Sequence, residues 1–329
     1  MRKYAMFVFS ALLVVVLFGA CAPPTSVAPE KVRVALILPS TIDDLAWSQS
    51  MYEGVKAVQA ELGEDRMEVT VTENLWNPVD ATAAIRDFAE QGYHLIIAHG
   101  AQYQNSLFEI APDFPDTSFA YGTSFKTADN IFAYDPQAQE GGYLLGIIAG
   151  MMTKTNKIGV VGPVEAGDAV KYNYGFVQGV ASVNPDAEVS VTYTGSFGDT
   201  AGAGEMAKTH MDNGADFLTG TAQQAVGAIQ AAKERGVPWL GSDMDQSVVW
   251  PDTVMAAQVY NWEEVVRRMV DARAEGKKGG EHLSLSFANG RLSLHFNDRF
   301  NIPAEVKAKV ETTLQAIKDG SLVVPLPSE

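Results

Sequence analysis

Paired acids and isolated aromatic residues are the side chains in this chain of 329 residues whose types and spacing suggest chemistry. Asp43 and Asp44 are adjacent, and Asp243 and Asp245 are separated by one residue. Two carboxyl groups near one another can act as general acid and base in a hydrolysis, or they can accept hydrogen bonds from the hydroxyl groups of a ligand. The spacing of the acids leaves both possibilities open.

Aromatic and amide side chains accompany these acids at the expected ends of buried strands. The candidate ligand-binding residues are Asp44, Trp47 and Tyr103 in the first part of the chain, and Tyr172, Asn173, Phe197 and Asp243 in the second. A flat ligand with a polar rim needs such a set, because two rings can stack on its faces while oxygens accept hydrogen bonds from its rim. The combination favours binding over turnover.

Ordinary structural roles are also open to several of these residues. Trp47 fits the apolar face of the helix expected after Asp44, so packing in the core is an alternative role. Asp243 and Asp245 can cap the turn in which they lie. Asp43 can cap the first helix, which makes Asp44 the better candidate for a ligand contact.

Motifs of common enzymes are absent from the sequence. There is no G-x-S-x-G, no P-loop and no H-E-x-x-H, and no G-x-G-x-x-G follows the first expected strand. The five histidines show no spacing typical of metal ligands. We therefore expect a protein that is not an enzyme, with no catalytic residues, no metal and no cofactor.

The elements that position the candidate residues alternate between strands and helices. An apolar strand at residues 34–39 precedes a polar loop and a helix that ends at Gly63. In open α/β sheets, ligands bind at the carboxyl ends of strands, where loops form a crevice and helix N-termini present free N–H groups. Asp44 and Trp47 lie at such an end.

The order of this first part recurs about 120 residues later. Residues 157–163 match the strand at 34–39, Glu188-Val-Ser-Val-Thr matches Glu68-Val-Thr-Val-Thr, and Phe197 follows at the place of Trp76. A strand–helix order that runs twice predicts an α/β fold of two doubly wound parallel-sheet lobes. Acids and aromatic residues from both copies would then face one another.

We expect three crossovers between the lobes, near residues 131–135, 257–260 and 283–291. The first lobe would comprise residues 32–132 plus about 259–284, and the second lobe residues 133–258 plus about 285–329. A helix expected at residues 137–152 carries three glycines at intervals of four residues, Gly142, Gly146 and Gly150. This small face predicts close packing on a neighbouring helix.

The first residues are typical of an export signal. Arg2 and Lys3 precede an uncharged apolar run, so we expect residues 1–20 to be a signal peptide. Cys21, the only cysteine, follows small residues as in bacterial lipoprotein signals, and residues 21–31 read as a lipid-anchored tether. The protein would be extracytoplasmic and anchored to the cell membrane, or periplasmic if Cys21 is not lipidated.

Charge excludes one class of partner. Removing residues 1–20 takes away two of the 24 basic residues and none of the 40 acids, which leaves a formal charge of 22 − 40 = −18. Such a surface repels phosphate backbones, so we expect no nucleic-acid partner. The expected partner is instead a small molecule, bound by a monomer.

Four stretches of the chain, with further residues near its end, resemble the basic membrane protein family. They are residues 43–54, 195–199, 211–216 and 241–247. Members of this family are lipid-anchored substrate-binding proteins of ABC importers, similar to the purine-nucleoside receptor lipoproteins. The resemblance implies a type I periplasmic-binding-protein fold that closes on a purine nucleobase or nucleoside and delivers it to an ABC permease.

The resemblance also implies roles for individual residues. Trp47 and Phe197 would sandwich the base, Asp243 would hold ribose hydroxyls, and Asp44 would contact polar ligand atoms. Nucleoside receptors carry a lysine where this chain has Tyr260 and Asn261, so Asn261 is a further candidate and the chain looks more like members that hold a bare purine. A sugar or other small polar ligand is the alternative within the binding class. A nucleoside-hydrolysing enzyme with Asp44 and Asp243 as acids is the alternative outside it.

Overall fold

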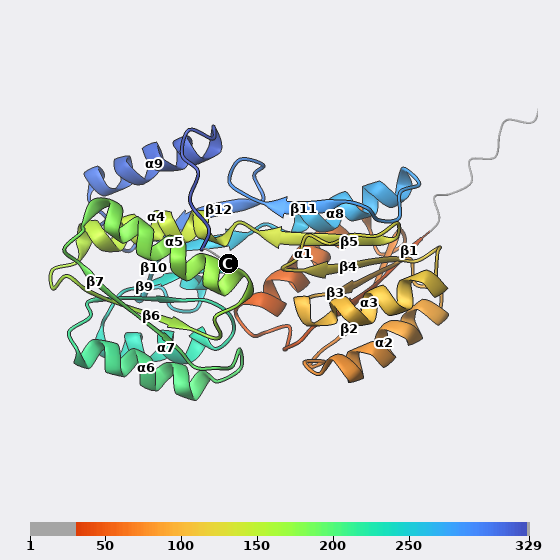
Figure 1. Ribbon diagram of the computed structural model, residues 1–329, viewed down its shortest axis with the longest axis horizontal. Helices are drawn as coiled ribbons and strands as arrows, with labels where there is room; N and C mark the ends of the chain where they lie inside the picture. Colours follow the sequence, from red (N-terminus) through yellow and green to blue (C-terminus); the bar gives the residue numbers. More distant parts are fainter. Residues whose placement is uncertain (1–30, 328–329) are drawn as a thin grey trace, which may run out of the picture. The chain divides into compact units, whose positions relative to one another are not determined.

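A computed structural model describes residues 31–327 of the protein (Figure 1). The expected signal peptide, the lipidation site at Cys21 and all but the last residue of the tether lie outside the described residues. No helix within residues 31–327 is long and apolar enough to cross a membrane. The described chain folds around two six-stranded sheets, and each sheet with its helices is called a lobe below.

All strand pairs of the first sheet are parallel, in the order β11-β5-β4-β3-β1-β2. Its strands are β1 (Val32–Ile37), β2 (Met67–Thr72), β3 (Leu95–Ala98), β4 (Ser118–Gly122), β5 (Ile131–Pro136) and β11 (His282–Leu285). The helices of this lobe are α1 (Trp47–Leu62), α2 (Pro78–Glu90), α3 (Gln104–Ile110) and α8 (Trp262–Ala274), with short 3-10 turns η1 (Ala101–Tyr103) and η2 (Ala111–Asp113).

The second sheet repeats this arrangement in the order β12-β10-β9-β8-β6-β7, with only the edge strand β12 antiparallel. Its strands are β6 (Lys157–Gly162), β7 (Glu188–Tyr193), β8 (Phe217–Gly220), β9 (Trp239–Gly241), β10 (Val254–Tyr260) and β12 (Leu292–Phe296). Its helices are α4 (Ala138–Met152), α5 (Gly167–Val183), α6 (Thr200–Asp212), α7 (Ala225–Arg235) and α9 (Ala304–Lys318), with the 3-10 turn η3 (Gln246–Val248).

The first strand of each copy lies between the second and third strands, as β3-β1-β2 and as β8-β6-β7. Loops leaving neighbouring strands therefore diverge and open a crevice at the carboxyl edge of each sheet. The chain passes between the sheets three times, from β5 to α4, from β10 to α8 and from β11 to β12. The predicted fold class, two doubly wound lobes joined by three crossovers, is confirmed.

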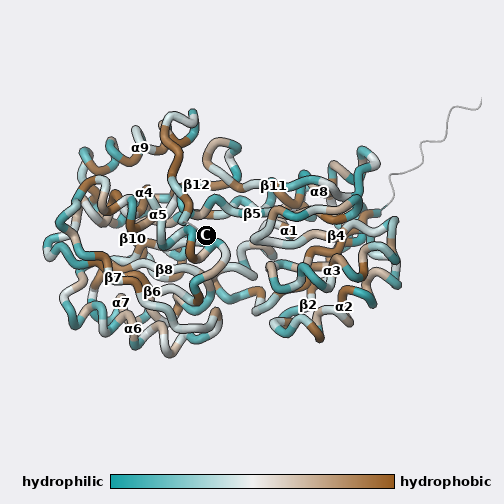
Figure 2. Tube along the Cα trace, viewed as in Figure 1, coloured by the Kyte–Doolittle hydropathy of each residue, from teal (hydrophilic) through white to brown (hydrophobic). Residues whose placement is uncertain are grey.

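Strand β1 illustrates how apolar side chains on both faces of a strand pack against helices on both sides of the sheet. Val34 and Leu36 join an apolar cluster with α1 and α8, whereas Ala35 and Ile37 join a second cluster with α2 and α3. Successive side chains of a strand point to opposite faces, and both faces here are apolar, which is typical of parallel sheets. Figure 2 shows hydrophobic stretches along strands such as β4 and β10.

The glycines of α4 have the packing role that their spacing predicted. A side-chain carbon on Gly142 would meet the carbonyl oxygen of Tyr172, and one on Gly146 would meet that of Phe176. Because both carbonyls belong to α5, the two helix backbones approach more closely than any residue with a side chain would allow. Close packing of this helix on a neighbour is confirmed.

Candidate ligand-binding site

A cavity of about 240 Å³ lies between the lobes, and we call it the interlobe cavity. It is lined by the start of α1 and by the loops that follow β1 to β4 in the first lobe and β6 to β9 in the second. These loops meet because the carboxyl ends of parallel strands share one edge of each sheet. The volume lies just below the roughly 300–1,000 Å³ of pockets for drug-sized molecules, so the cavity suits a small ligand.

Strained backbone marks these loops. Leu45, Thr123, Ala222 and Asp243 have positive φ angles of 56°, 53°, 66° and 73°, in the left-handed region that residues with side chains rarely adopt. Two of them are joined, because the Ala222 backbone N–H donates to Asp243 Oδ2 over 3.0 Å. Strain of this kind is kept where surrounding structure enforces it and tends to cluster at functional sites.

Trp47 lines the cavity from the first lobe and is held rigidly from behind. Its ring stacks on His99 with 4.1 Å between centroids and an interplanar angle of 12°. Trp47 Nε1 donates to the His99 carbonyl over 3.1 Å, and His99 Nε2 donates to the Trp47 carbonyl over 3.0 Å. Trp47 is therefore both a core residue, 9% exposed, and part of the cavity wall.

The tautomer of His99 follows from its partners. A carbonyl only accepts, so Nε2 carries the proton and Nδ1 accepts from the Tyr134 hydroxyl at 2.8 Å. Burial lowers the pKa of His99 to about 3, although the hydrogen bond to Trp47 favours the charged form. His99 thus supports the indole as a neutral ring.

Phe197 lines the cavity from the second lobe, where it meets an aromatic residue of the first. Its ring lies 5.4 Å from that of Trp76, with the planes tilted by 46°. Trp76 is half exposed and also lines the cavity. Trp76 was not among the predicted site residues. The internal repeat had nevertheless matched its position in the first half of the chain to that of Phe197 in the second.

Two buried acids of the second lobe line the same cavity. Asp243 is 1% exposed, and its Oδ1 has no hydrogen-bond partner within residues 31–327. Burial, with the nearby Asp168 carboxyl, raises the pKa of Asp243 well above its usual range. Asp168 Oδ2 accepts from the Tyr260 hydroxyl at 3.3 Å, and burial raises the pKa of Asp168 to about 6. Sequence reasoning found Asp243 but missed Asp168.

Amides complete the polar lining. Gln102 Nε2 from the first lobe and Gln223 Oε1 from the second are buried, and neither has a partner in the described part of the chain. No Lys, Arg or His is among the described residues that line the cavity. Residues 31–327 also contain no group of three or more acids, histidines or cysteines placed to hold a metal. The cavity can therefore hydrogen-bond a neutral ligand but offers no cation to an anionic one.

Asp44 was predicted to contact the ligand, but its carboxylate is hydrogen-bonded to the start of its own helix, α1. Its carboxylate accepts from the backbone N–H groups of Ala46, Ser48 and Gln49 at 3.0, 3.1 and 3.0 Å. It is not among the residues that line the cavity. Asp44 thus has the capping role expected for Asp43, which is exposed.

Three other predicted residues, Tyr103, Tyr172 and Asn173, are buried. The Tyr103 hydroxyl donates to the Leu75 carbonyl over 2.8 Å, next to Trp76. The Tyr172 hydroxyl lies 2.7 Å from Thr219 Oγ1. Asn173 is 2% exposed, and neither atom of its amide has a partner within residues 31–327. None of the three lines the interlobe cavity.

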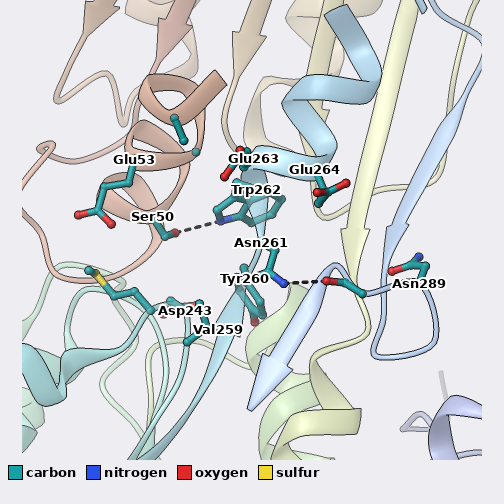
Figure 3. A pocket seen from close by; sticks show the side chains of 14 residues that line it. Ser50, Glu53, Asp243, Val259, Tyr260, Asn261, Trp262, Glu263, Glu264 and Asn289 are labelled. Atoms are coloured by element: carbon teal, nitrogen blue, oxygen red, sulfur yellow. Dashed lines mark hydrogen bonds between the residues drawn. The ribbon is translucent and has the colours of Figure 1, made fainter. Parts of the chain in front are cut away.

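Asn261 lines a different cavity, of about 570 Å³, beside the β10–α8 crossover; we call it the hinge cavity (Figure 3). Asn261 Nδ2 donates to the Gly290 carbonyl over 2.7 Å, so its amide joins two crossovers. Trp262 Nε1 donates to Ser50 Oγ over 3.0 Å in the same wall. Among residues 31–327, Asp243 alone lines both cavities.

Asp245, the second member of the later acid pair, caps a turn as expected. Its Oδ1 accepts from the Ser247 backbone N–H at 3.0 Å at the start of η3. The His295 ring, whose Nδ1 lies 3.7 Å from Asp245 Oδ2, lowers the pKa of Asp245 to about 2. Asp243 lines the interlobe cavity, whereas Asp245 does not.

The chain is similar to a family of known proteins in sequence and to solved structures in fold. Residues 31–324 match the family described as ABC transporter substrate-binding protein PnrA-like. A purine-binding protein of Brucella abortus is 31% identical over 295 residues, which cover 90% of this chain and 83% of that protein. Basic membrane protein A of Borreliella burgdorferi is 26% identical, covering 97% and 95%. An ABC transporter solute-binding protein of Aeropyrum pernix has the same fold, with a TM-score of 0.80 at 22% identity over 91% of this chain and 94% of that one.

Proposed function

Because the chain belongs to the family of PnrA-like ABC transporter substrate-binding proteins, we propose that it captures a purine nucleobase or nucleoside between its lobes and delivers it to an ABC permease. Proteins of this family are extracytoplasmic, and the relative with 31% identity is named as purine-binding. The family establishes the class of protein. The ligand is our proposal from the interlobe cavity.

One observation carries the proposal: Trp47 and Phe197, which belong to different lobes, line one small cavity together with two buried acids. A planar heterocycle between these rings would gain about 1–3 kcal/mol from each base–aromatic stack. Carboxylates accept hydrogen bonds but cannot donate them when ionised. Asp168, which is ionised above about pH 6, therefore suits the N–H and O–H groups on the rim of a purine or on its ribose.

Closure of the lobes would complete this site. Gln246 Nε2 of the second lobe donates to the Leu45 carbonyl of the first over 3.2 Å, next to the cavity. Such contacts can form only when the lobes approach one another. Hinge motion at the three crossovers would open and close the cavity around its ligand.

Hydrolysis of a nucleoside is disfavoured by the position of the acids. Asp44, the acid of the first lobe, is bound to three backbone N–H groups and does not line the cavity, so it cannot face Asp243 across a substrate. A sugar remains a second candidate ligand, because aromatic faces and carboxylates also suit a polyhydroxylated ring. The experiment below separates these possibilities.

The mature protein would be a lipid-anchored monomer. We propose that residues 1–20 direct export and that Cys21 is lipidated, which would keep the binding lobes near the permease. Cys21→Ser should release the protein from the membrane fraction without changing ligand affinity. Retention of the variant in the membrane would contradict the proposed anchor.

A thermal-shift screen followed by calorimetry tests the proposed function. A ligand that binds only the folded state raises the unfolding temperature by mass action. We expect a shift with purine bases or nucleosides and none with aldoses. Incubation with adenosine should return adenosine unchanged. Binding of sugars alone, or catalytic release of adenine, would overturn the proposal.

A further inference from the structure

We propose that Asp168 is a specificity-determining residue that, with Asp243, selects ligands presenting N–H or O–H donors to the second lobe. The inference rests on the proposed function and extends it, because it states which purines the site prefers. Adenine, with an exocyclic amino group, should bind better than hypoxanthine, which carries an oxygen at the same ring position. The matching pair of ribosides should show the same order.

The position of Asp168 brings a buried acid to the cavity wall. It is the second residue of α5, and the preceding Gly167 has a φ of +62° that turns the chain into the helix. Asp168 is 8% exposed and lines the interlobe cavity. A carboxylate there also benefits from the partial positive charge of the helix N-terminus.

Only one Asp168 oxygen is tied to a side-chain donor. The Tyr260 hydroxyl donates to Oδ2 over 3.3 Å, which fixes the orientation of the carboxyl group. The backbone N–H of Asp168 itself also donates to this carboxyl group, and a ligand in the cavity would be a further donor. Because Tyr260 is fully buried at the end of β10, it holds the acid without reaching past it into the cavity lining.

Asp243 and Gln223 add acceptors on the same side. Asp243 Oδ1 and Gln223 Oε1 are buried atoms of the cavity lining with no partner among the described residues. Gln102 Nε2, a donor of the first lobe, is also buried and without a partner among the described residues. Small side-chain shifts on ligand binding would turn these atoms to the cavity, with acceptors on the second lobe and a donor on the first. A buried unpaired polar atom is unfavourable, so a ligand of matching pattern is favoured over one of inverted pattern.

The charged groups around Asp168 set the pH at which it ionises. Lys171, one turn further along α5, favours the charged form, but its Nζ is paired with Asp135 Oδ1 of β5 at 2.7 Å. Burial is the main cause that opposes ionisation of Asp168, and the Asp135 carboxyl adds to it, whereas Tyr260 favours ionisation through its hydrogen bond. Asp168 in turn opposes ionisation of Asp243. Asp44 and Tyr172 lie near enough to influence Asp243 but not to pair with it.

A protonation change at Asp168 converts an acceptor into a donor. With its pKa raised to about 6, the acid is ionised at pH 7.5 and mostly protonated at pH 5. A ligand that donates to the carboxylate binds the ionised form, so its affinity should fall on acidification. One pH unit below the pKa corresponds to a loss of about tenfold. Binding near pH 6 should also release a proton.

The test compares the unchanged protein with Asp168→Asn by calorimetry. Adenine, hypoxanthine and their ribosides are titrated at pH 5, 6 and 7.5, in two buffers of different ionisation enthalpy. Asn keeps the shape of the side chain but adds a donor and cannot ionise. Asp186→Asn is the matched control, because Asp186 is an exposed acid in the turn after α5.

We expect the unchanged protein and Asp186→Asn to prefer adenine or its riboside by about tenfold or more, the factor that corresponds to one well-placed hydrogen bond. Both should release a proton near pH 6. Asp168→Asn should lose most of the preference and the pH dependence. Equal preference and equal proton release in Asp168→Asn would overturn the inference while leaving purine binding intact. If the unchanged protein bound none of the four compounds, the proposed function would itself fail, and this inference with it. The proton release of the unchanged protein provides a test that does not depend on any variant.

Discussion

The rings of Trp76 and Phe197 lie 5.4 Å apart between centroids, although one residue belongs to each lobe. They follow the second strand of their respective sheets, β2 and β7, at matched places of the internal repeat. Both line the interlobe cavity. Because the pair joins the two lobes, it must separate when the lobes open, so the contact is part of the closed state.

Trp76→Ala should therefore speed ligand release more than it slows capture. Aromatic pairs contribute about 0.5–1.5 kcal/mol beyond their buried area, which corresponds to roughly a twofold to twelvefold faster dissociation. Stopped-flow fluorescence with the best purine ligand measures both rates. Phe125→Ala is the control, since Phe125 is 81% exposed and does not line the cavity. An unchanged dissociation rate in Trp76→Ala would contradict this role.

Phe197→Ala and Trp47→Ala should each weaken purine binding by about 1–3 kcal/mol. The two variants should differ in stability. Trp47 is packed against His99 in the core, so its truncation should also destabilise the fold by about 3–5 kcal/mol. Phe197 is only partly buried, so the same change there should leave the unfolding temperature nearly unchanged. Calorimetry and thermal unfolding separate the effects, and full affinity in both variants would refute the stacking arrangement.

Asp44→Ala should lower stability rather than affinity. The carboxylate accepts three backbone N–H groups at the start of α1, and loss of such a cap typically removes about 1–2 kcal/mol. The affinity for ligand should change by less than about twofold, because Asp44 does not line the cavity. Chemical denaturation and titration of the same preparation provide the two numbers. A large loss of affinity at normal stability would restore the direct ligand contact expected from the sequence.

Asp168→Asn should stabilise the ligand-free protein at neutral and alkaline pH. The folded-state pKa is raised from 3.8 to about 6, so folding opposes ionisation of this acid and the penalty is present above pH 6. The gain is at most about 3 kcal/mol, and it should disappear as the pH falls through 6 toward 4. Denaturant unfolding at pH 8 and pH 4 measures the difference. A variant less stable than the unchanged protein at pH 8 would contradict the assignment of a strained buried acid.

His99 should have the opposite influence on acid stability. Its folded-state pKa is lowered to about 3 from 6.5, so the unfolded chain binds a proton that the folded chain refuses. The stabilisation from neutral His99 is complete above pH 6.5 and is lost progressively between pH 6.5 and 3. In His99→Gln, the change of stability over this range should be smaller than in the unchanged protein. An equal slope in the two proteins would show that His99 is protonated without unfolding.

The fold could be predicted because its signals are local and occur twice. Apolar strands closed by polar loops recur in the same order, and two such copies have few ways to bury both faces of their sheets. Gly142 and Gly146 added a prediction of helix packing that the contacts with α5 confirm. The lobe boundaries at the crossovers remain a prediction, as do the expected signal peptide and anchor.

The site was harder to predict because acids at similar places in the two halves of the chain point their side chains in different directions. Asp44 and Asp168 each follow the first strand of their sheet, yet Asp44 turns back onto its helix whereas Asp168 reaches the cavity lining. Backbone angles decide such outcomes, and Leu45 adopts the left-handed conformation although leucine is not among the residues that favour it. The sequence therefore contains no local signal for this turn. Trp76 is different, since the repeat with Phe197 already marked its position.

The three crossovers restrict how the lobes can move. One of them, between β10 and α8, consists of Asn261 alone, and another, between β5 and α4, consists of Gln137 alone. Connections this short act as nearly inextensible tethers. Bending about the line that joins them changes their lengths little, whereas sliding or twisting one lobe over the other would stretch at least one. The proposed opening would thus be reduced to nearly a single degree of freedom, which would return the same side chains to the same cavity at every closure.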